Sequence, residues 1–130
     1  MKFSWCTLMV NDMEKSLAFY QGFLGLNINR RFSPDSDTDI CFLSGGSDQA
    51  EIELIYNKNA AQKLTAIKAE EKGVGINLGI DIEGSLDEMI EKLDKHNIKV
   101  LRGPIQPSPQ IRFLFVNDPN GYEVQLAEHL

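Results

Sequence analysis

Apolar residues recur along the chain with two periods, one typical of strands and one typical of helices. Residues 75–82 alternate apolar and other side chains, as a half-buried strand does, and residues 3–10 also predict a strand. Apolar positions spaced by three and four residues begin at Met13 and again after Ser85, and each series predicts an amphipathic helix. Three short strands are predicted after each helix, at residues 26–32, 40–44 and 50–56 in the first half and at 98–102, 111–117 and 122–127 in the second.

Polar residues, glycines and prolines mark the ends of these elements. Ser85 and Glu88 have the spacing of a capping box, and Asp12 is placed to cap the first helix. Residues 118–121 (Asp-Pro-Asn-Gly) strongly predict a turn, and further turns are predicted at 33–35 and 45–46. The densest irregular stretch is predicted between Gly103 and the prolines that follow it, Pro104, Pro107 and Pro109.

The two halves repeat the same order of strand, helix and three strands. Asp12 and Gly84 lie 72 residues apart, as do Glu53 and Gln125, although residue identity between the halves is poor. We therefore predict an α+β fold in which two tandem βαβββ modules form a single domain over residues 1–130. The first module covers 1–57, a linker with a short helix covers 58–73, and the second module covers 74–130.

Composition and charge exclude several classes of protein. The net charge of −6 argues against nucleic-acid binding, which needs a basic surface. Two histidines and two cysteines are too few for a three-histidine zinc site or a disulfide framework. No apolar run approaches the roughly 20 residues of a membrane span, and the first residues lack a signal-peptide pattern. We expect a cytoplasmic protein with reduced thiols, Cys6 and Cys41 being small buried apolar residues.

Strand alternation indicates which polar side chains share a face of the sheet. If the helices cover the aliphatic faces, the opposite faces carry Trp5, Thr7, Glu53, Asn77 and Gln125. These side chains either line a concave site or form the solvated side of half-exposed strands, and alternation by itself favours the second interpretation.

Three other polar residues have an ordinary structural interpretation beside a functional one. Arg112 on the seventh predicted strand is placed to contact an anionic ligand, although an exposed structural arginine is the commoner case. His96 lies at a predicted helix end, where a cation complements the helix dipole. We expect His129, the penultimate residue, to be frayed.

Three segments carry a resemblance to known proteins. They are residues 12–26, which begin DMEKSLAFY and end FLGL, residues 52–57 (IELIYN) and residues 118–126 (DPNGYEVQL). Together they resemble the vicinal oxygen chelate superfamily, which includes glyoxalase I (lactoylglutathione lyase), bleomycin-resistance proteins, fosfomycin-resistance enzymes and extradiol dioxygenases. The resemblance covers essentially the whole chain. It implies two βαβββ modules whose mixed sheets curl around a cleft, usually in a homodimer.

The resemblance also implies where a divalent metal would be bound in metal-dependent members. The ligand positions on the first and fourth strands of each module correspond here to Trp5, Glu53, Gly75 and Gln125. Glu53 matches a family ligand, and Gln125 stands where glyoxalase I carries a glutamate that is both ligand and proton-transfer base. Because Trp5 and Gly75 cannot coordinate a metal through their side chains, we expect no metal and no other cofactor.

Three functions remain open on these grounds. The favoured one is a metal-free binder of a small aromatic or cationic ligand, similar to the bleomycin-resistance branch, because Trp5 suits stacking on a flat ligand and the acidic balance disfavours anions. Its predicted ligand-binding residues are Trp5, Thr7, Glu53, Asn77, Arg112 and Gln125. The alternative is an enzyme, either a divergent lactoylglutathione lyase or a metal-free isomerase with Glu53 as the general base. The third is a dimeric interaction protein with a vestigial cleft.

Overall fold

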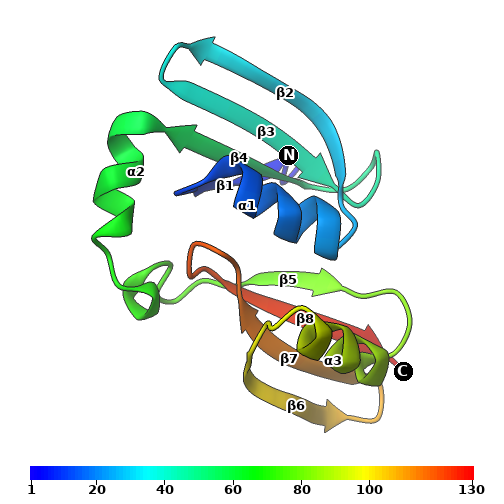
Figure 1. Cartoon of the computed structure of the whole chain (residues 1–130). Helices are drawn as coiled ribbons and strands as arrows, with labels where there is room; N and C mark the ends of the chain where they lie inside the picture. The colour runs from blue at the N-terminus through cyan, green and yellow to red at the C-terminus, as the bar shows by residue number, and fades with distance from the viewer. The chain divides into compact units, whose positions relative to one another are not determined.

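Each half of the chain folds around its own four-stranded sheet. The computed structural model describes residues 1–130 and divides into two units, Met1–Lys68 and Ala69–Leu130 (Figure 1). The first unit contains β1 (Trp5–Met9), α1 (Met13–Leu17), β2 (Asn27–Asp35), β3 (Thr38–Ser44), β4 (Glu51–Asn57) and α2 (Lys58–Thr65). The second contains a short 3₁₀ turn (Ala69–Glu71), β5 (Leu78–Asp81), α3 (Leu86–Lys95), β6 (Val100–Ser108), β7 (Ile111–Asn117) and β8 (Glu123–His129).

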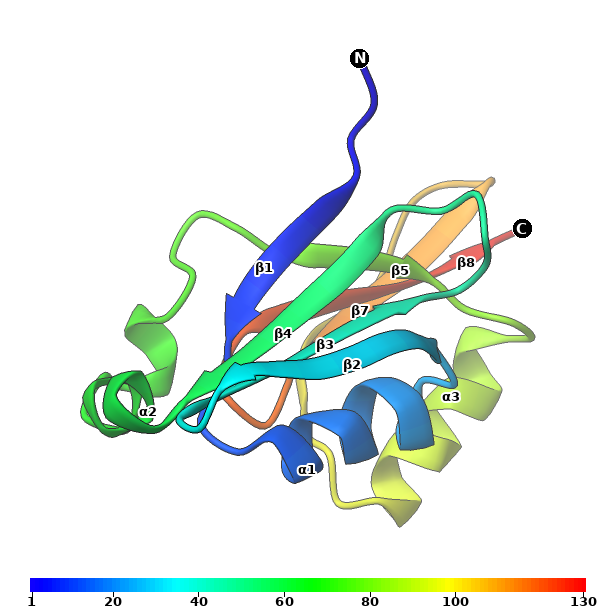
Figure 2. The same ribbon diagram turned by 90° about the horizontal axis from the view of Figure 1, so that it is seen from above.

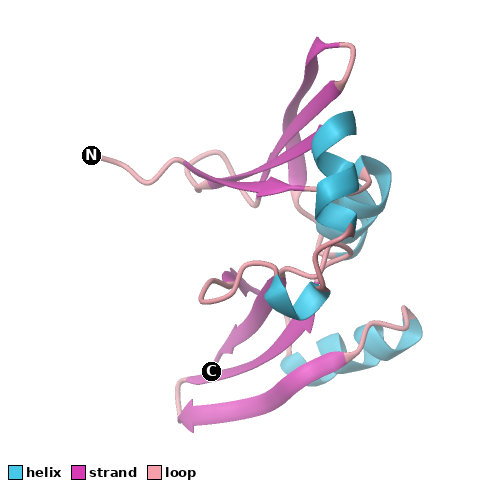
Figure 3. Cartoon of the chain, turned by 90° about the vertical axis from the view of Figure 1, so that its left-hand side faces the viewer, coloured by secondary structure: helices cyan, strands magenta, loops and turns pink.

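The two sheets have the same topology, which confirms the predicted pair of βαβββ modules. Their strand orders are β1-β4-β3-β2 and β5-β8-β7-β6. β1 runs parallel to β4 and β5 runs parallel to β8, while the other neighbours are antiparallel. In each unit a helix covers one face of the sheet, because α1 packs on β4 and α3 packs on β6 and β8 (Figure 2 and Figure 3). The predicted linker helix, α2, packs on β1 and β4, and no helix is long and apolar enough to span a membrane.

The helix-covered face of each sheet forms a hydrophobic core. In the first unit Leu54 lies between Leu8 and Cys41 in the strand register, and in the second unit Leu126 lies beside Leu114. Leu54, Cys41, Leu114 and Leu126 have no solvent exposure. Cys41 is therefore buried as the sequence predicts, and burial raises the pKa of its thiol, whereas Cys6 is only partly buried.

The first helix has the predicted extent but changes its winding. Asp12 caps α1 by accepting a hydrogen bond from the backbone N–H of Lys15 at 3.1 Å. After Leu17 the chain continues as a π-helical segment over Ala18–Phe23, in which the N–H of Leu24 donates to the carbonyl of Phe19, five residues earlier. The aromatic side chains of this segment, Phe19, Tyr20 and Phe23, are buried.

Two proline-containing segments are strands, so the sequence-based predictions for them are wrong. A turn is predicted at 33–35, whereas β2 runs through Asp35 and the turn follows at 36–37. An irregular stretch is predicted after Gly103, whereas β6 continues to Ser108 with shifts in its register against β7. Both strands are at the edge of their sheets, where a proline can be accommodated because one side of the strand has no ladder partner.

The fifth strand is shorter than its alternating pattern predicts. The pattern covers residues 75–82, but β5 covers only Leu78–Asp81. Gly73 and Gly75 precede it with φ values of +61° and +85°, which depart from the extended conformation of regular strand residues. The residues before Leu78 therefore form a loop, and Gly75 is not a strand residue.

The predicted signals at α3 and at the last turn are confirmed. The Ser85 hydroxyl accepts a hydrogen bond from the backbone N–H of Glu88 at 3.1 Å, and the Glu88 carboxylate accepts one from the N–H of Ser85 at 3.5 Å. In the turn before β8, the buried Asp118 carboxylate accepts from the backbone N–H groups of Asn120 and Tyr122, both at 2.8 Å. Side chains thus supply the acceptors that these backbone groups lack.

The cap of α3 gives the first testable prediction. Replacing Ser85 with alanine removes the acceptor for the Glu88 N–H, so the free energy of unfolding is expected to fall by about 1 kcal/mol. Urea denaturation followed by circular dichroism measures this change. Ser47→Ala, in the exposed β3–β4 loop, is the matched control and is expected to change stability by less than about 0.5 kcal/mol. Equal losses in the two variants would contradict the assigned cap.

Candidate functional site

The face of the first sheet opposite α1 carries an aromatic and polar cluster. The strand register places Thr7 beside Glu53 and Glu53 beside Phe42. The Thr7 hydroxyl donates a hydrogen bond to Glu53 Oε1 at 2.5 Å. The Trp5 ring meets Phe42 edge to face with a centroid distance of 6.2 Å, and Trp5 remains 53% exposed. Three of the predicted site residues, Trp5, Thr7 and Glu53, therefore share one face.

An arginine that the sequence analysis missed completes this cluster. The guanidinium carbon of Arg30 lies 3.9 Å from the centroid of the Phe42 ring. Arg30 donates to both carboxylate oxygens of Glu51 at 3.0 Å, and Asn29 donates to the same carboxylate at 2.9 Å. The hydrogen bonds from Asn29 and Arg30 hold the pKa of Glu51 below its usual value. Glu51 thus has a cationic partner, whereas Glu53 has a hydroxyl partner.

The second sheet carries the same arrangement on its corresponding face. Arg102 lies beside Phe115 in the register, with its guanidinium carbon 4.2 Å from the centroid of the ring. Both terminal nitrogens of Arg102 donate to the carboxylate of Glu123. Gln125, another predicted site residue, lies beside Phe115 on β8. Each unit therefore presents an arginine that stacks on a phenylalanine and pairs with a glutamate.

The register also identifies the counterpart of Trp5 in the second unit. Thr7 pairs with Glu53, and Gly79 pairs with Gln125 in the same way. Trp5 lies two positions before Thr7, and Asn77 lies two positions before Gly79, so Trp5 and Asn77 correspond. The correspondence of Trp5 with Gly75 expected from the resemblance is wrong, because Gly75 lies in the loop before β5.

A groove of about 620 Å³ opens in the second unit beside this cluster. Its lining includes Asn77, Arg102, Asn117 and Glu123, together with the glycine-rich loop before β5. The groove thus brings one predicted site residue, Asn77, together with the arginine and glutamate of the repeated arrangement.

Arg112 does not join the other predicted site residues. It alternates with Phe113 and so lies on the helix-covered face of the second sheet, where it donates to Asp87 of α3 at 3.1 Å. Its second terminal nitrogen lies 3.7 Å from the carboxylate of Glu128. The hydrogen bond to Asp87 is the main reason that the pKa of Arg112 is raised. Arg112 connects α3 to the sheet in this structure.

The two histidines have local partners. His96 follows the last turn of α3, as expected, and its Nδ1 lies 2.8 Å from the carbonyl oxygen of Lys92. His129 is not frayed as the sequence predicts, because it is the last residue of β8 and its Nε2 lies 2.8 Å from Oδ1 of Asp81. Both histidines belong to the second unit, whereas Trp5 and Glu53 belong to the first.

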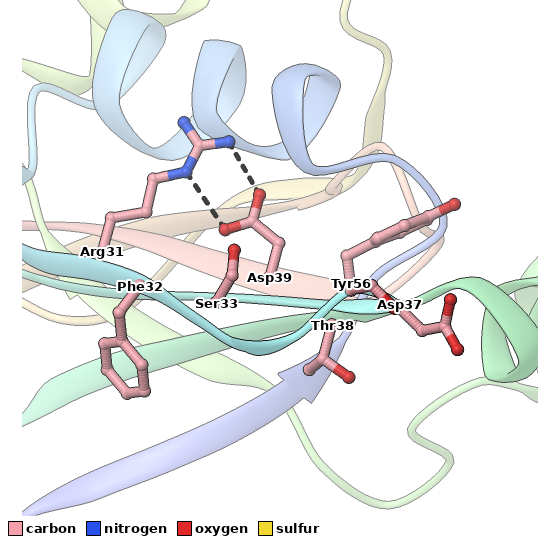
Figure 4. A pocket seen from close by; sticks show the side chains of 8 residues that line it. Arg31, Phe32, Ser33, Asp37, Thr38, Asp39 and Tyr56 are labelled. Carbon is pink, nitrogen blue, oxygen red and sulfur yellow. Dashed lines mark hydrogen bonds and ion pairs between the residues drawn. The ribbon is translucent and has the colours of Figure 1, made fainter.

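A separate cavity of about 410 Å³ lies beside the β2–β3 turn of the first unit. Figure 4 shows Arg31 and Asp39 on one side of these strands and Phe32 on the other. Arg31 donates to Asp39 at 2.8 and 3.2 Å and to Glu14 at 2.7 Å, and these bonds raise the pKa of its guanidinium. The cavity contains none of the predicted site residues, and its arginine is fully engaged with two carboxylates.

The side chains present do not fit a divalent metal centre. No group of three or more His, Cys, Asp or Glu side chains is arranged to hold an ion. At the positions implied by the resemblance, the side chains of Trp5 and Gly75 offer no atom that coordinates a metal, and Gln125 offers a neutral amide oxygen. The register counterpart, Asn77, also offers only an amide, and Glu53 already accepts from Thr7. This set lacks the imidazole groups and second carboxylate that such catalytic centres use.

Comparison with known sequences gives one consistent result. A family model described as the glyoxalase/bleomycin resistance protein/dioxygenase superfamily matches residues 2–126. A probable lactoylglutathione lyase from Synechocystis sp. is 32% identical over 128 residues, which cover 93% of this chain and 90% of the relative. A lactoylglutathione lyase from Haemophilus influenzae is 29% identical over 128 residues, which cover 94% of this chain and 88% of the relative.

Solved structures show the same fold at lower sequence identity. A glyoxalase family protein from Bacillus cereus has a TM-score of 0.81 with 18% identity and covers 100% of this chain and 95% of its own. The trypanothione-dependent glyoxalase I of Leishmania major has a TM-score of 0.79 with 24% identity, and the match covers 98% of this chain and 86% of that protein. An antibiotic binding protein from Streptomyces sp. has a TM-score of 0.64 with 19% identity, and the match covers 100% of this chain and 97% of that protein.

Proposed function

Because the chain belongs to the glyoxalase/bleomycin resistance protein/dioxygenase superfamily, we propose that it binds a small planar aromatic ligand on the Trp5 face of its first sheet, without a metal held by its own side chains. The observation that carries this proposal is the exposed Trp5 ring, which lies nearly perpendicular to the buried Phe42 ring and in contact with it. Tryptophan is a large apolar residue that proteins usually bury to a high degree. An exposed indole held against a second ring is a surface on which a flat ligand stacks.

The charges on this face favour a cationic or neutral ligand. Arg30 is paired with Glu51, so Glu53 contributes a carboxylate that no cation neutralises in the structure. The net charge of −6 acts in the same direction at longer range. Trp5, Thr7 and Glu53 are the proposed contacts on the first unit. Asn77 and Gln125 stay predicted contacts on the second unit, and the homodimer and the cytoplasmic location also stay predictions.

An enzymatic function is the second candidate. The relatives named as lactoylglutathione lyases favour it, and Thr7 holds the Glu53 carboxylate in one orientation, as a general base requires. Proton abstraction beside a carbonyl also needs a group that stabilises the developing oxyanion. Arg30, the nearest cation of the cluster, is already engaged with Glu51. Ligand binding is therefore the proposal, and catalysis by Glu53 is the alternative.

Tryptophan fluorescence provides the test, because Trp5 is the single tryptophan of the chain. N-methylquinolinium, a planar cation, is expected to quench its emission saturably, and 2-naphthalenesulfonate, a planar anion of similar size, to bind at least about tenfold more weakly. By calorimetry, Trp5→Leu is expected to weaken binding of the cation at least about tenfold. The matched control Phe3→Leu removes an exposed aromatic ring outside the cluster and leaves binding unchanged. Absence of saturable binding, or wild-type affinity in Trp5→Leu, would overturn the proposal.

Glu53→Gln separates the two candidates. As a ligand contact, Glu53 contributes charge, so the variant is expected to bind N-methylquinolinium several-fold more weakly while neither protein forms lactoylglutathione above the uncatalysed rate. If the wild type forms lactoylglutathione and Glu53→Gln does not, the enzyme is the correct function.

A further inference from the structure

The Trp5 face of the first sheet carries a second exposed aromatic ring at its other edge. Phe32 on β2 is 47% exposed, and Figure 4 shows its side chain on the side of the strands opposite to Arg31 and Asp39. The Phe32 ring is nearly parallel to that of Phe42, with an interplanar angle of 14° and a centroid distance of 6.5 Å. The buried Phe42 ring thus has an exposed ring toward each outer strand, Trp5 on β1 and Phe32 on β2.

A row of apolar side chains crosses the same face from one outer strand to the other. The strand register places Met9 beside Ile55 and Ile55 beside Ile40. Ile40 in turn lies beside Phe32, and all four residues are partly exposed. Met9 lies four positions after Trp5 on β1, so the row is on the Trp5 face. Neighbouring strands lie about 4.8 Å apart, so the row is about 14 Å long, and a single bicyclic ring on Trp5 leaves part of it uncovered.

Charge is distributed unevenly over this face. Glu53 lies on β4, next to β1, and its carboxylate has no cationic partner. Arg30, which reaches over the face from β2, is neutralised by Glu51. The apolar row toward Phe32 contains no charged residue. The face therefore offers a negative charge near one outer strand and an uncharged apolar surface that continues to the other.

On the basis of the function proposed above, we infer that the ligand of the Trp5 face is an elongated aromatic cation. Its charged ring stacks on Trp5 near Glu53, and its uncharged end lies along the apolar row against Phe32. The charge at one end complements the Glu53 carboxylate, and burial of the other end removes exposed apolar surface from water. Phe32 is thus a further binding residue, which selects ligands by their length.

Two cations that share one charged ring and differ in length provide the test. N-methyl-2-styrylquinolinium has the ring system of N-methylquinolinium and carries one additional conjugated phenyl group. By calorimetry, the wild-type protein is expected to bind the longer cation at least about tenfold more tightly. Phe32→Ser is expected to weaken binding of the longer cation at least about fivefold and to leave that of N-methylquinolinium within about twofold. The matched control Phe3→Ser removes another exposed phenylalanine and leaves both affinities unchanged.

Failure of this inference is distinguishable from failure of the proposed function. Equal affinities for the two cations, or equal effects of Phe32→Ser on both, would overturn the inference alone, whereas no binding of either cation would overturn both. If Phe32→Ser leaves both affinities unchanged and lowers the oligomeric mass in size-exclusion chromatography, Phe32 belongs to a contact between copies and the inference is wrong.

The position of Phe32 makes the variant suitable for this test. Because Phe32 is half exposed on an outer strand, Phe32→Ser is expected to fold, which thermal unfolding by circular dichroism verifies. The milder substitution Phe32→Leu keeps apolar surface without the ring and is expected to weaken binding of the longer cation about two- to fivefold. Wild-type affinity in both variants would contradict the assigned contact.

Discussion

Replacing Leu126 with alanine is expected to lower the free energy of unfolding by about 3–4 kcal/mol. Leu126 has no solvent exposure and lies on β8, between Ile80 of β5 and Leu114 of β7. Alanine would leave a cavity in the centre of the sheet that strands on both sides prevent from collapsing. Urea denaturation followed by circular dichroism measures the loss.

Leu130→Ala is the matched control for this substitution. Leu130 is 54% exposed, and its truncation is expected to cost less than about 0.5 kcal/mol. A loss below about 1 kcal/mol for Leu126→Ala would mean that β8 does not lie in the centre of a rigid core.

Gly121→Ala is expected to destabilise the second unit by about 2–4 kcal/mol, for two independent reasons. Gly121 has φ +95°, which is unfavourable for alanine. The added Cβ would also lie 2.8 Å from the Cβ and 2.9 Å from the Cα of Ala69, so the backbone must move. Both residues line the groove of the second unit.

Gly22→Ala is the control substitution for Gly121→Ala. Gly22 lies in the helical segment after α1, has no positive φ, and its added Cβ would meet no atom within 4 Å. Alanine is expected to leave stability unchanged or to raise it by up to about 1 kcal/mol. A loss of similar size in both glycine variants would refute the steric explanation for Gly121.

Most of the fold follows from signals that act over a few residues. The capping box at Ser85 and the turn at Asp118 are local, and each appears in the structure where the sequence predicts it, whereas the alternating pattern at 75–82 yields a strand only over Leu78–Asp81. Two other failures concern residues whose environment is set by a neighbouring strand. Pro34 and Pro104 suggest irregular backbone, yet they lie in edge strands that tolerate proline.

The candidate site was predictable in part. Alternation is sufficient to group Trp5 with Thr7 and, given the register, with Glu53. It fails for Arg112, because β7 is apolar on both faces, with Leu114 on one and Phe115 on the other, so its pattern does not indicate which face the helix covers.

The stacked arginines were harder to find. Arg30 reaches Phe42 only because the register shifts between Ile28 and Arg30, and no sequence signal predicts that shift. The available clue was the spacing of 72 residues, which Arg30 and Arg102 share with Glu53 and Gln125. Applied to every charged residue, that spacing would have identified both arginine–glutamate pairs.

The prolines of the outer strands have a consequence for self-association. An exposed strand edge is a template on which another chain can add a strand, and this is how many β-proteins polymerise. β2 and β6 are the longest strands of their sheets and lie at the edge, but Pro34 interrupts one and Pro104 and Pro107 interrupt the other. Each proline removes an N–H donor, and the bulges in both strands distort what remains. These two edges are therefore poor templates for ordered aggregation, whereas β1 and β5, at the opposite edges of the two sheets, are short and contain no proline.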